Sequence, residues 1–124
     1  MNYDQELKII DEFVGRECER TLACSTLKIR FGKKNPYIWI DPPWVLKKNQ
    51  IKITASIDYS TDEVGFFKWS ETLAPLNSTI FEGYKYNLRD GLVLNFSHGI
   101  TLHVPTTLDT IDEDDFYNHW YASK

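Results

Sequence analysis

Two short runs of alternating apolar residues, separated by a tight turn, constrain the fold of this chain more than any other feature. Residues 92–96 (LVLNF) and 100–104 (ITLHV) both place a large apolar side chain at every second position. His98-Gly99 lies between the runs, and Pro105 follows the second one and cannot continue a strand ladder. Because strand side chains alternate between two faces, the pattern predicts a hairpin with one apolar face, which must be covered.

An earlier part of the chain follows the same plan. Residues 27–31 (LKIRF) and 37–43 (YIWIDPP) parallel the two strands of that hairpin, with the turn-like GKKNP between them. Asp90-Gly91 is a further turn signal, so the preceding YKYNL is expected to supply a third strand. The segment 50–59 (QIKITASIDY) is expected to contain another strand. The pattern therefore predicts two related antiparallel β-meanders, and leaves open whether they form one sheet, a sandwich or a half-open barrel.

A helix is expected before the first meander. Asn2 is a capping residue type, and apolar residues recur at helical spacing until Gly15, namely Tyr3, Leu7, Ile10 and Val14. A second helix is expected at the C-terminus. Residues 110–113 (TIDE) form a capping-box pattern, and two aromatic pairs four residues apart follow it, Phe116/Trp120 and Tyr117/Tyr121. The fold class is therefore α+β, mainly β, with an N-terminal helix and a short C-terminal helix.

The segment 61–74 stays open between a short helix and a strand. Ser60 and Glu63 have the spacing of a capping box, but Gly65 disfavours a helix at that point. With 124 residues, the chain is expected to be a single domain. In that domain, residues 1–60 provide a helix and the first meander, and residues 61–124 provide the second meander and a helix.

The location of the protein is expected to be cytoplasmic. The N-terminus lacks a basic-then-apolar signal pattern, and no apolar run approaches the ~18 residues that a membrane span needs. Cys18 and Cys24 do not form a C-x-x-C pair. In a reducing compartment, each is better interpreted as a small buried apolar side chain than as a disulfide partner.

The stretch Asp41-Pro42-Pro43-Trp44 (DPPW) resembles the signature loop of adenine-N6 methyltransferases. Such enzymes are usually larger than this chain, and they need a glycine-rich turn, whereas no two of the six glycines lie close enough to form one. The alternative interpretation is a strand terminator, since prolines cannot donate to a ladder, with Trp44 folding back onto the core. The parallel with the second meander favours this terminator.

The sequence contains few candidates for catalytic or metal-binding residues. His98, His103 and His119 have no convincing partner pattern, and no cysteine or carboxylate completes a metal-ligand set with them. Enzymatic activity, a metal and a cofactor are therefore not expected. An enzyme with a small-molecule pocket between the two meanders is a further possibility, but no set of catalytic residues in the sequence supports it.

Charge is distributed unevenly along the chain. The net charge of −4 argues against nonspecific binding of nucleic acid by the whole domain. Residues 25–52 nevertheless hold seven cations against Asp41 alone, whereas residues 61–115 hold ten acids against three cations. The densest acidic group lies next to aromatic residues near the C-terminus. It is either the ordinary acidic start of a helix or a recognition patch for a basic partner.

A family resemblance favours the second interpretation. The pattern LAPLNSTI, GLVLNFSHGITLHVP and DDFYNHW in the last ~55 residues resembles small bacterial domains among the immunity proteins of polymorphic and contact-dependent growth inhibition toxin systems. The resemblance implies a non-enzymatic, acidic antidote that binds a toxin's C-terminal domain, often a nuclease, and blocks its active site. On this hypothesis the toxin-binding residues are Asp112, Glu113, Asp114, Asp115, Tyr117 and Trp120.

An alternative function belongs to another class. Lys28 and Arg30 face outward on the first predicted hairpin, with Tyr37 and Trp39 across the turn. Cations beside aromatic platforms on a sheet are typical of single-stranded nucleic-acid recognition. The structural alternative is a basic, solvated strand face whose aromatic rings cover the sheet.

Overall fold

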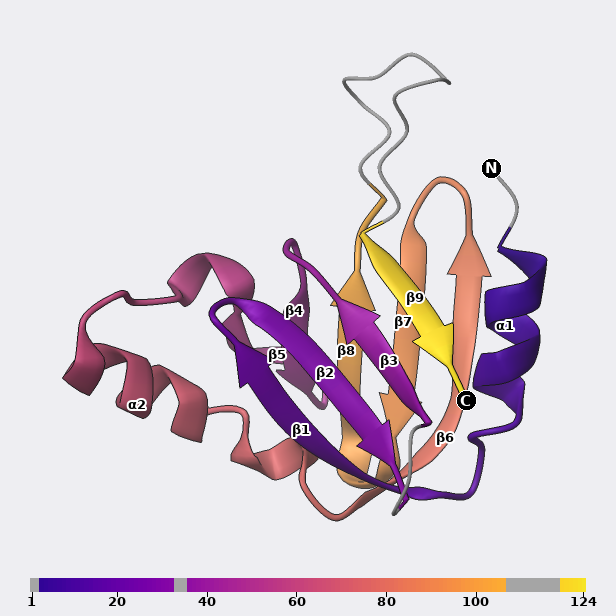
Figure 1. The fold of residues 1–124 in the computed structure, drawn as a ribbon, viewed down its shortest axis with the longest axis horizontal. Coiled ribbons are helices and arrows are strands. Elements are labelled where there is room, and N and C mark those ends of the chain that lie inside the picture. The colour runs from indigo at the N-terminus through magenta and orange to yellow at the C-terminus, as the bar shows by residue number, and fades with distance from the viewer. Residues whose placement is uncertain (1–2, 33–35, 107–118) are drawn as a thin grey trace.

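The computed structural model describes residues 3–32, 36–106 and 119–124, and it has the α+β, mainly β, class that the sequence predicts (Figure 1). The helices are α1 (Asp4–Asp11) and α2 (Glu63–Glu71), with short 3-10 turns at Ser56–Asp58, Ala74–Leu76 and Ser97–Gly99. The strands are β1 (Glu17–Ala23), β2 (Thr26–Phe31), β3 (Tyr37–Ile40), β4 (Val45–Lys48), β5 (Ile51–Ala55), β6 (Thr79–Asn87), β7 (Gly91–Phe96), β8 (Ile100–Val104) and β9 (Trp120–Ser123).

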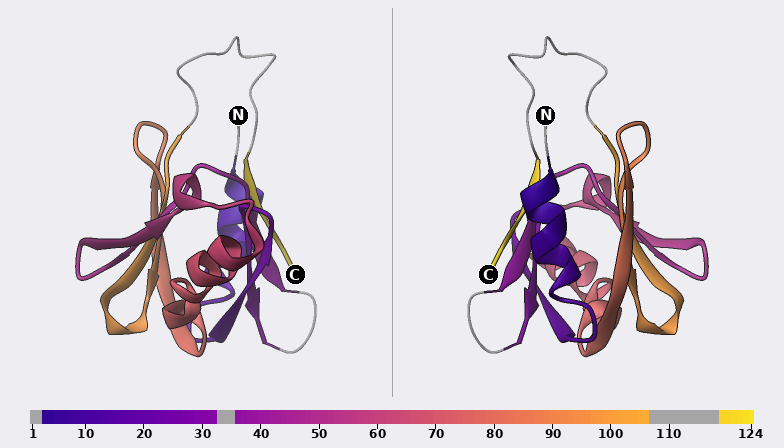
Figure 2. Two further views of the ribbon diagram at one scale, coloured as in Figure 1. Left: turned by 90° about the vertical axis from the view of Figure 1, so that its left-hand side faces the viewer. Right: turned by 90° about the vertical axis from the view of Figure 1, so that its right-hand side faces the viewer.

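The strands form one antiparallel sheet in the order β5-β4-β8-β7-β6-β1-β2-β3-β9. The predicted hairpin of β2 and β3 is present, and the second predicted meander is present as the neighbouring strands β6-β7-β8. A strand that the sequence did not predict, β1, pairs with β2, whereas the strand expected within residues 50–59 is β5, which pairs with β4 and not with β3. Only two residue pairs, Glu17 with Ile80 and Cys18 with Thr79, join β1 to β6. At this narrow junction the sheet turns back on itself, so its two halves face each other, with α2 at one side and α1 at the other (Figure 2).

The core lies between the two halves. The alternating apolar residues of both hairpins point inward and are buried, as their period of two predicts. From β2 and β3 they are Leu27, Ile29, Phe31, Ile38 and Ile40, and from β7 and β8 they are Leu92, Leu94, Phe96, Ile100, Leu102 and Val104. The opposite, outward side chains of the same strands are therefore available to solvent or to a partner.

The DPPW stretch is the corner between the two halves. Strand β3 ends at Ile40 in one half, and β4 begins at Val45 in the other. Trp44 is fully buried, and its Nε1 donates a hydrogen bond of 2.9 Å to the carbonyl oxygen of Ser25. The predictions that DPPW ends a strand and that Trp44 packs onto the core are both confirmed. The corner also leads the chain from one half of the sheet to the other.

The open choice for residues 61–74 is settled as a helix. Asp62, not Ser60, caps α2, because its carboxylate accepts a hydrogen bond of 2.9 Å from the backbone N–H of Gly65. A Cβ at residue 65 would lie 2.5 Å from the Ser60 hydroxyl oxygen, so the glycine makes room for this start. On the inner side, Trp69 is buried and donates from Nε1 to the Ala55 carbonyl oxygen at 3.1 Å.

The predicted C-terminal helix is wrong. Residues 120–123 form β9, which pairs antiparallel with β3, Trp120 lying opposite Ile40 and Tyr121 opposite Trp39. The edge of β3 offers backbone hydrogen-bond partners to this segment. A buried Trp120 next to an exposed Tyr121 is compatible with a strand as well as with a helix. The capping-box pattern at residues 110–113 lies outside the described residues.

The N-terminal helix is confirmed, although it is shorter than its apolar pattern. Its last residue is Asp11, and the chain turns before Gly15, whose N–H donates to the Phe81 carbonyl oxygen at 2.8 Å. Just before the helix, the Tyr3 ring stacks on that of Trp120, with centroids 4.5 Å apart. Contacts of this kind hold α1 between β9 and β6.

Candidate functional site

One face of the sheet combines aromatic and cationic side chains and has no described helix over it. It is the outward side of β2, β3 and β9, and we call it the outer aromatic face (Figure 2). It consists of Lys28, Arg30, Tyr37, Trp39 and Tyr121. Four of these five residues belong to the predicted nucleic-acid platform, and the strand pairing places them together on one surface.

The register of the strands sets the order on this face. Lys28 lies opposite Trp39, which in turn lies opposite Tyr121, and Arg30 lies opposite Tyr37 in the neighbouring row. Directly opposite residues in antiparallel strands have Cβ atoms about 4.5–5.5 Å apart, so their side chains are neighbours. The face is therefore a contiguous surface from β2 to β9.

The aromatic side chains contact one another and the nearest cation. The Lys28 Nζ lies 4.4 Å from the centroid of the Tyr37 ring, which is cation–π distance. The rings of Trp39 and Tyr121 are nearly parallel, with centroids 6.3 Å apart and an angle of 20° between their planes. A hydrogen bond with Tyr37, together with partial burial, raises the pKa of Tyr121. These contacts reduce the freedom of the side chains before any ligand arrives.

Asp41 fixes the orientation of Trp39. Its Oδ1 accepts hydrogen bonds from the Trp39 Nε1 at 3.1 Å and from the Thr26 hydroxyl at 2.7 Å. The same residue begins the DPPW corner, so the corner that ends β3 also holds an aromatic side chain of the outer aromatic face. A preorganised aromatic side chain loses less conformational entropy on binding.

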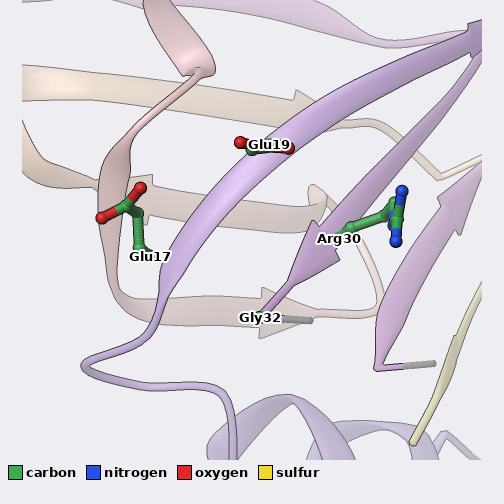
Figure 3. A pocket seen from close by; sticks show the side chains of 4 residues that line it. All are labelled: Glu17, Glu19, Arg30 and Gly32. Carbon is green, nitrogen blue, oxygen red and sulfur yellow. The ribbon is translucent and has the colours of Figure 1, made fainter. Parts of the chain in front are cut away.

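An open hollow lies beside the outer aromatic face, at the start of β1. Its volume is about 530 Å³, and it is lined by Glu17, Glu19, Arg30 and Gly32. In Figure 3 the Arg30 side chain points away from the two glutamates. The ion pairs found among the described residues are Lys52 with Asp58 and Lys124 with Glu12, so neither glutamate has a cationic partner in that part of the chain.

The predicted toxin-binding residues are only partly described. Asp112, Glu113, Asp114, Asp115 and Tyr117 lie outside the described residues. Trp120 is 2% exposed and stacks on Tyr3, so its side chain lies in the core and not on the surface. The surface aromatic of this segment is Tyr121, 40% exposed, which the helical interpretation overlooked, and the four residues of β9 carry no sequence pattern that would have indicated it.

Comparisons with protein-family models, with curated proteins and with solved structures gave no match. The surface itself is therefore the basis for a functional proposal.

Histidine, cysteine and acidic residues are dispersed over the part of the chain that the structure describes. None of them form a group of three or more histidine, cysteine or acidic residues that could hold a metal ion. The Nε2 of His103 lies 3.1 Å from the Asp90 carbonyl oxygen, and His98 lies in the turn between β7 and β8. In the described segments, no helix is both long enough and apolar enough to span a bilayer.

A second exposed apolar surface lies on α2. Val64 is 61% exposed and Phe67 is 65% exposed, and both border an open hollow of about 550 Å³. Apolar side chains at this spacing lie on one face of a helix, here the face directed away from Trp69. This surface lacks the network of contacts that orders the outer aromatic face, and it provides control positions for binding experiments.

His119 gives a pH-dependent prediction. It is 3% exposed, and no described atom hydrogen bonds to its Nε2. It borders a cavity of about 10 Å³ that Tyr3 and Tyr86 also line. Burial lowers the pKa of His119 below its ordinary value of 6.5, although the charge of Asp41 and a hydrogen bond with the Pro43 backbone act in the opposite direction.

The folded protein therefore resists protonation of His119 more than the unfolded chain does. As the pH falls below 6.5, the unfolded chain binds the proton first, so stability present above that pH is lost. We expect the free energy of unfolding to fall more steeply between pH 7.5 and 5 in the natural protein than in a His119→Gln variant. Urea denaturation of both proteins across this range measures the difference, and parallel pH profiles would contradict the prediction.

Proposed function

We propose that this chain is a non-enzymatic immunity protein, which binds a bacterial toxin domain and covers the toxin's active site. The observation that supports it best is the outer aromatic face, a sheet surface that no described helix covers, with Trp39 on its middle strand and Tyr121 beside it on β9. Trp, Tyr and Arg are the residue types that most often contribute the largest share of binding energy in protein interfaces. The resemblance of the C-terminal sequence pattern to immunity proteins supports the same class.

Tight neutralisation places demands on such a surface. A stable inhibitor complex buries roughly 1,200–2,000 Å² and needs a few well-ordered anchors near its centre. On the outer aromatic face, Asp41 holds Trp39 and the Tyr37 hydroxyl interacts with Tyr121, so two such anchors are already ordered. This order favours binding because less side-chain freedom is lost.

The acidic residues at 112–115 have a separate role in this proposal. Together with Tyr117, they are proposed to attract a basic toxin domain, most simply a nuclease, whose own surface must bind a polyanion. Their place in the sequence just before β9 puts them close in the chain to Tyr121. Charge of this kind speeds association more than it strengthens the final complex.

The proposal is tested by affinity capture of the tagged chain from cells of its native host, followed by an activity assay of the captured protein. We expect a basic domain of a larger secreted protein in equimolar amount, with nuclease activity that the chain abolishes when added back. Reversal of the charges at residues 112–115 should slow association and reduce its dependence on salt. A captured domain whose activity is unaffected by the chain would contradict the proposal.

Single-stranded nucleic-acid binding is a second candidate, and a specific observation favours it. Lys28 lies over the Tyr37 ring, and Trp39 and Tyr121 lie on adjacent strands of the same face. Sheets that bind single strands combine cations with aromatic rings on which bases stack. A mobility shift of labelled oligo(U) and oligo(dT) over a range of salt concentrations tests it, and binding that weakens with salt is the expected result for this candidate.

A further inference from the structure

The charges around the outer aromatic face are arranged in zones. Across one row of paired residues the order is Glu19 on β1, Arg30 on β2 and Tyr37 on β3. Glu17 extends the acidic zone toward β6, where it lies opposite Ile80, which is itself exposed. The surface therefore changes from acidic on β1, to cationic on β2, to aromatic on β3 and β9.

This arrangement is unfavourable for a nucleic-acid backbone. A groove that follows a polyanion is positively charged along its length, since each phosphate must be neutralised. Here two carboxylates without a described cationic partner lie on the same side of the sheet as Lys28 and Arg30. A protein surface, in contrast, can present charges of both signs in a complementary order.

We infer that the outer aromatic face, together with the hollow at Glu17 and Glu19, is a docking surface for a protein segment with a basic side chain followed by apolar ones. The inference names the contact surface of the proposed inhibitor and rests on that proposed function. The basic side chain enters the hollow, and the apolar side chains cover Trp39 and Tyr121. The position of Arg30, directed away from the glutamates, leaves both carboxylates available to the incoming cation.

Arginine is the side chain that fits this hollow best. Its planar guanidinium forms two parallel hydrogen bonds with a carboxylate, and two glutamates on one strand face offer a second acceptor. Successive outward residues on a strand are about 6.6–6.8 Å apart, a distance that an arginine between them can bridge. An exposed ion pair alone contributes little, so the aromatic contacts must supply most of the affinity.

A random peptide library displayed on phage tests the inference while the natural partner is still unidentified. The probe is the library selected on the immobilised full-length protein, and the enriched peptides are then synthesised for affinity measurement. We expect peptides with arginine or lysine next to aliphatic or aromatic residues. Their affinity should fall about tenfold or more in the Glu17→Lys/Glu19→Lys variant and in Trp39→Ala.

Matched controls lie on α2. Glu63→Lys/Glu71→Lys changes the net charge by the same amount, and Phe67→Ala removes another exposed aromatic ring. Both should leave affinity within about twofold. Thermal unfolding of every variant confirms that the protein is folded. The docking surface would be overturned by enrichment of acidic peptides or by no enrichment at all. Equal losses of affinity in the control variants would overturn it too. So would displacement of the selected peptides by oligo(U).

The outcome separates this inference from the proposed function. A captured toxin domain that binds Trp39→Ala and Glu17→Lys/Glu19→Lys normally would refute the docking surface and leave the inhibitor function intact. Selected peptides that obey the expected pattern, in a protein that captures no toxin, would support the docking surface and refute the inhibitor.

Discussion

Replacement of Trp44 by alanine is expected to lower the free energy of unfolding by about 3–5 kcal/mol, the range measured for buried aromatic side chains. Trp44 is fully buried at the corner between the two sheet halves, and its ring lies 5.8 Å from that of Trp69. The variant leaves a cavity at this corner and removes the hydrogen bond to the Ser25 carbonyl oxygen. Urea denaturation followed by circular dichroism measures the loss.

Trp39→Ala is the matched control, because Trp39 lies only five residues earlier and points outward. Its ring is partly exposed, and its Nε1 donates a hydrogen bond to the half-buried carboxylate of Asp41. We expect a loss of no more than about 1 kcal/mol, typical of a surface substitution that breaks one polar contact. Equal losses in the two variants would show that Trp44 has no special role at the corner.

The sequence predicted best those elements whose apolar residues alternate without interruption. The β7–β8 hairpin and its counterpart β2–β3 were found because every second residue is large and apolar. Strand β1 was missed, since its exposed residues are charged or small and Cys18 is the one fully buried residue in it. Its place in the sheet depends on the pairing of Cys18 to Ala23 with β2, which no local pattern reveals.

The C-terminal segment shows a different limit. Aromatic residues four apart fit a helix, but residues 120–123 are too few to distinguish a period of 3.6 from a period of two. The free edge of β3 decided the outcome, because hydrogen bonds across that edge are available to only one of the two structures. A tertiary contact therefore overrode the local pattern.

The candidate site was predicted in part for the same reason. Lys28, Arg30, Tyr37 and Trp39 belong to one hairpin, so alternation alone placed them on one face. Tyr121 comes from a strand more than eighty residues later, and only the pairing of β3 with β9 brings it beside Trp39. The hollow was also beyond sequence reasoning, because it combines β1 with β2.

Replacement of Gly91 by alanine is expected to destabilise the protein by at least about 3 kcal/mol, near the upper end of single substitutions. Gly91 begins β7 with φ of +92°, where a side chain is strained. A Cβ there would meet the Val104 carbonyl oxygen and would lie 2.8 Å from the Thr106 nitrogen. Both are backbone atoms, one in the last residue of β8 and one two residues beyond it, so neither can rotate away, and relief requires β7 and this segment to separate.

Gly15→Ala separates this steric effect from backbone strain. Gly15 has a similar φ of +88°, but no atom lies within 4 Å of the position that its Cβ would occupy. We expect that variant to lose about 1 kcal/mol, which is the cost of a left-handed backbone conformation alone. Urea denaturation of both variants gives the comparison. If the two losses are equal, the close approach of Gly91 to the end of β8 does not contribute, and the glycine is required only for its conformation.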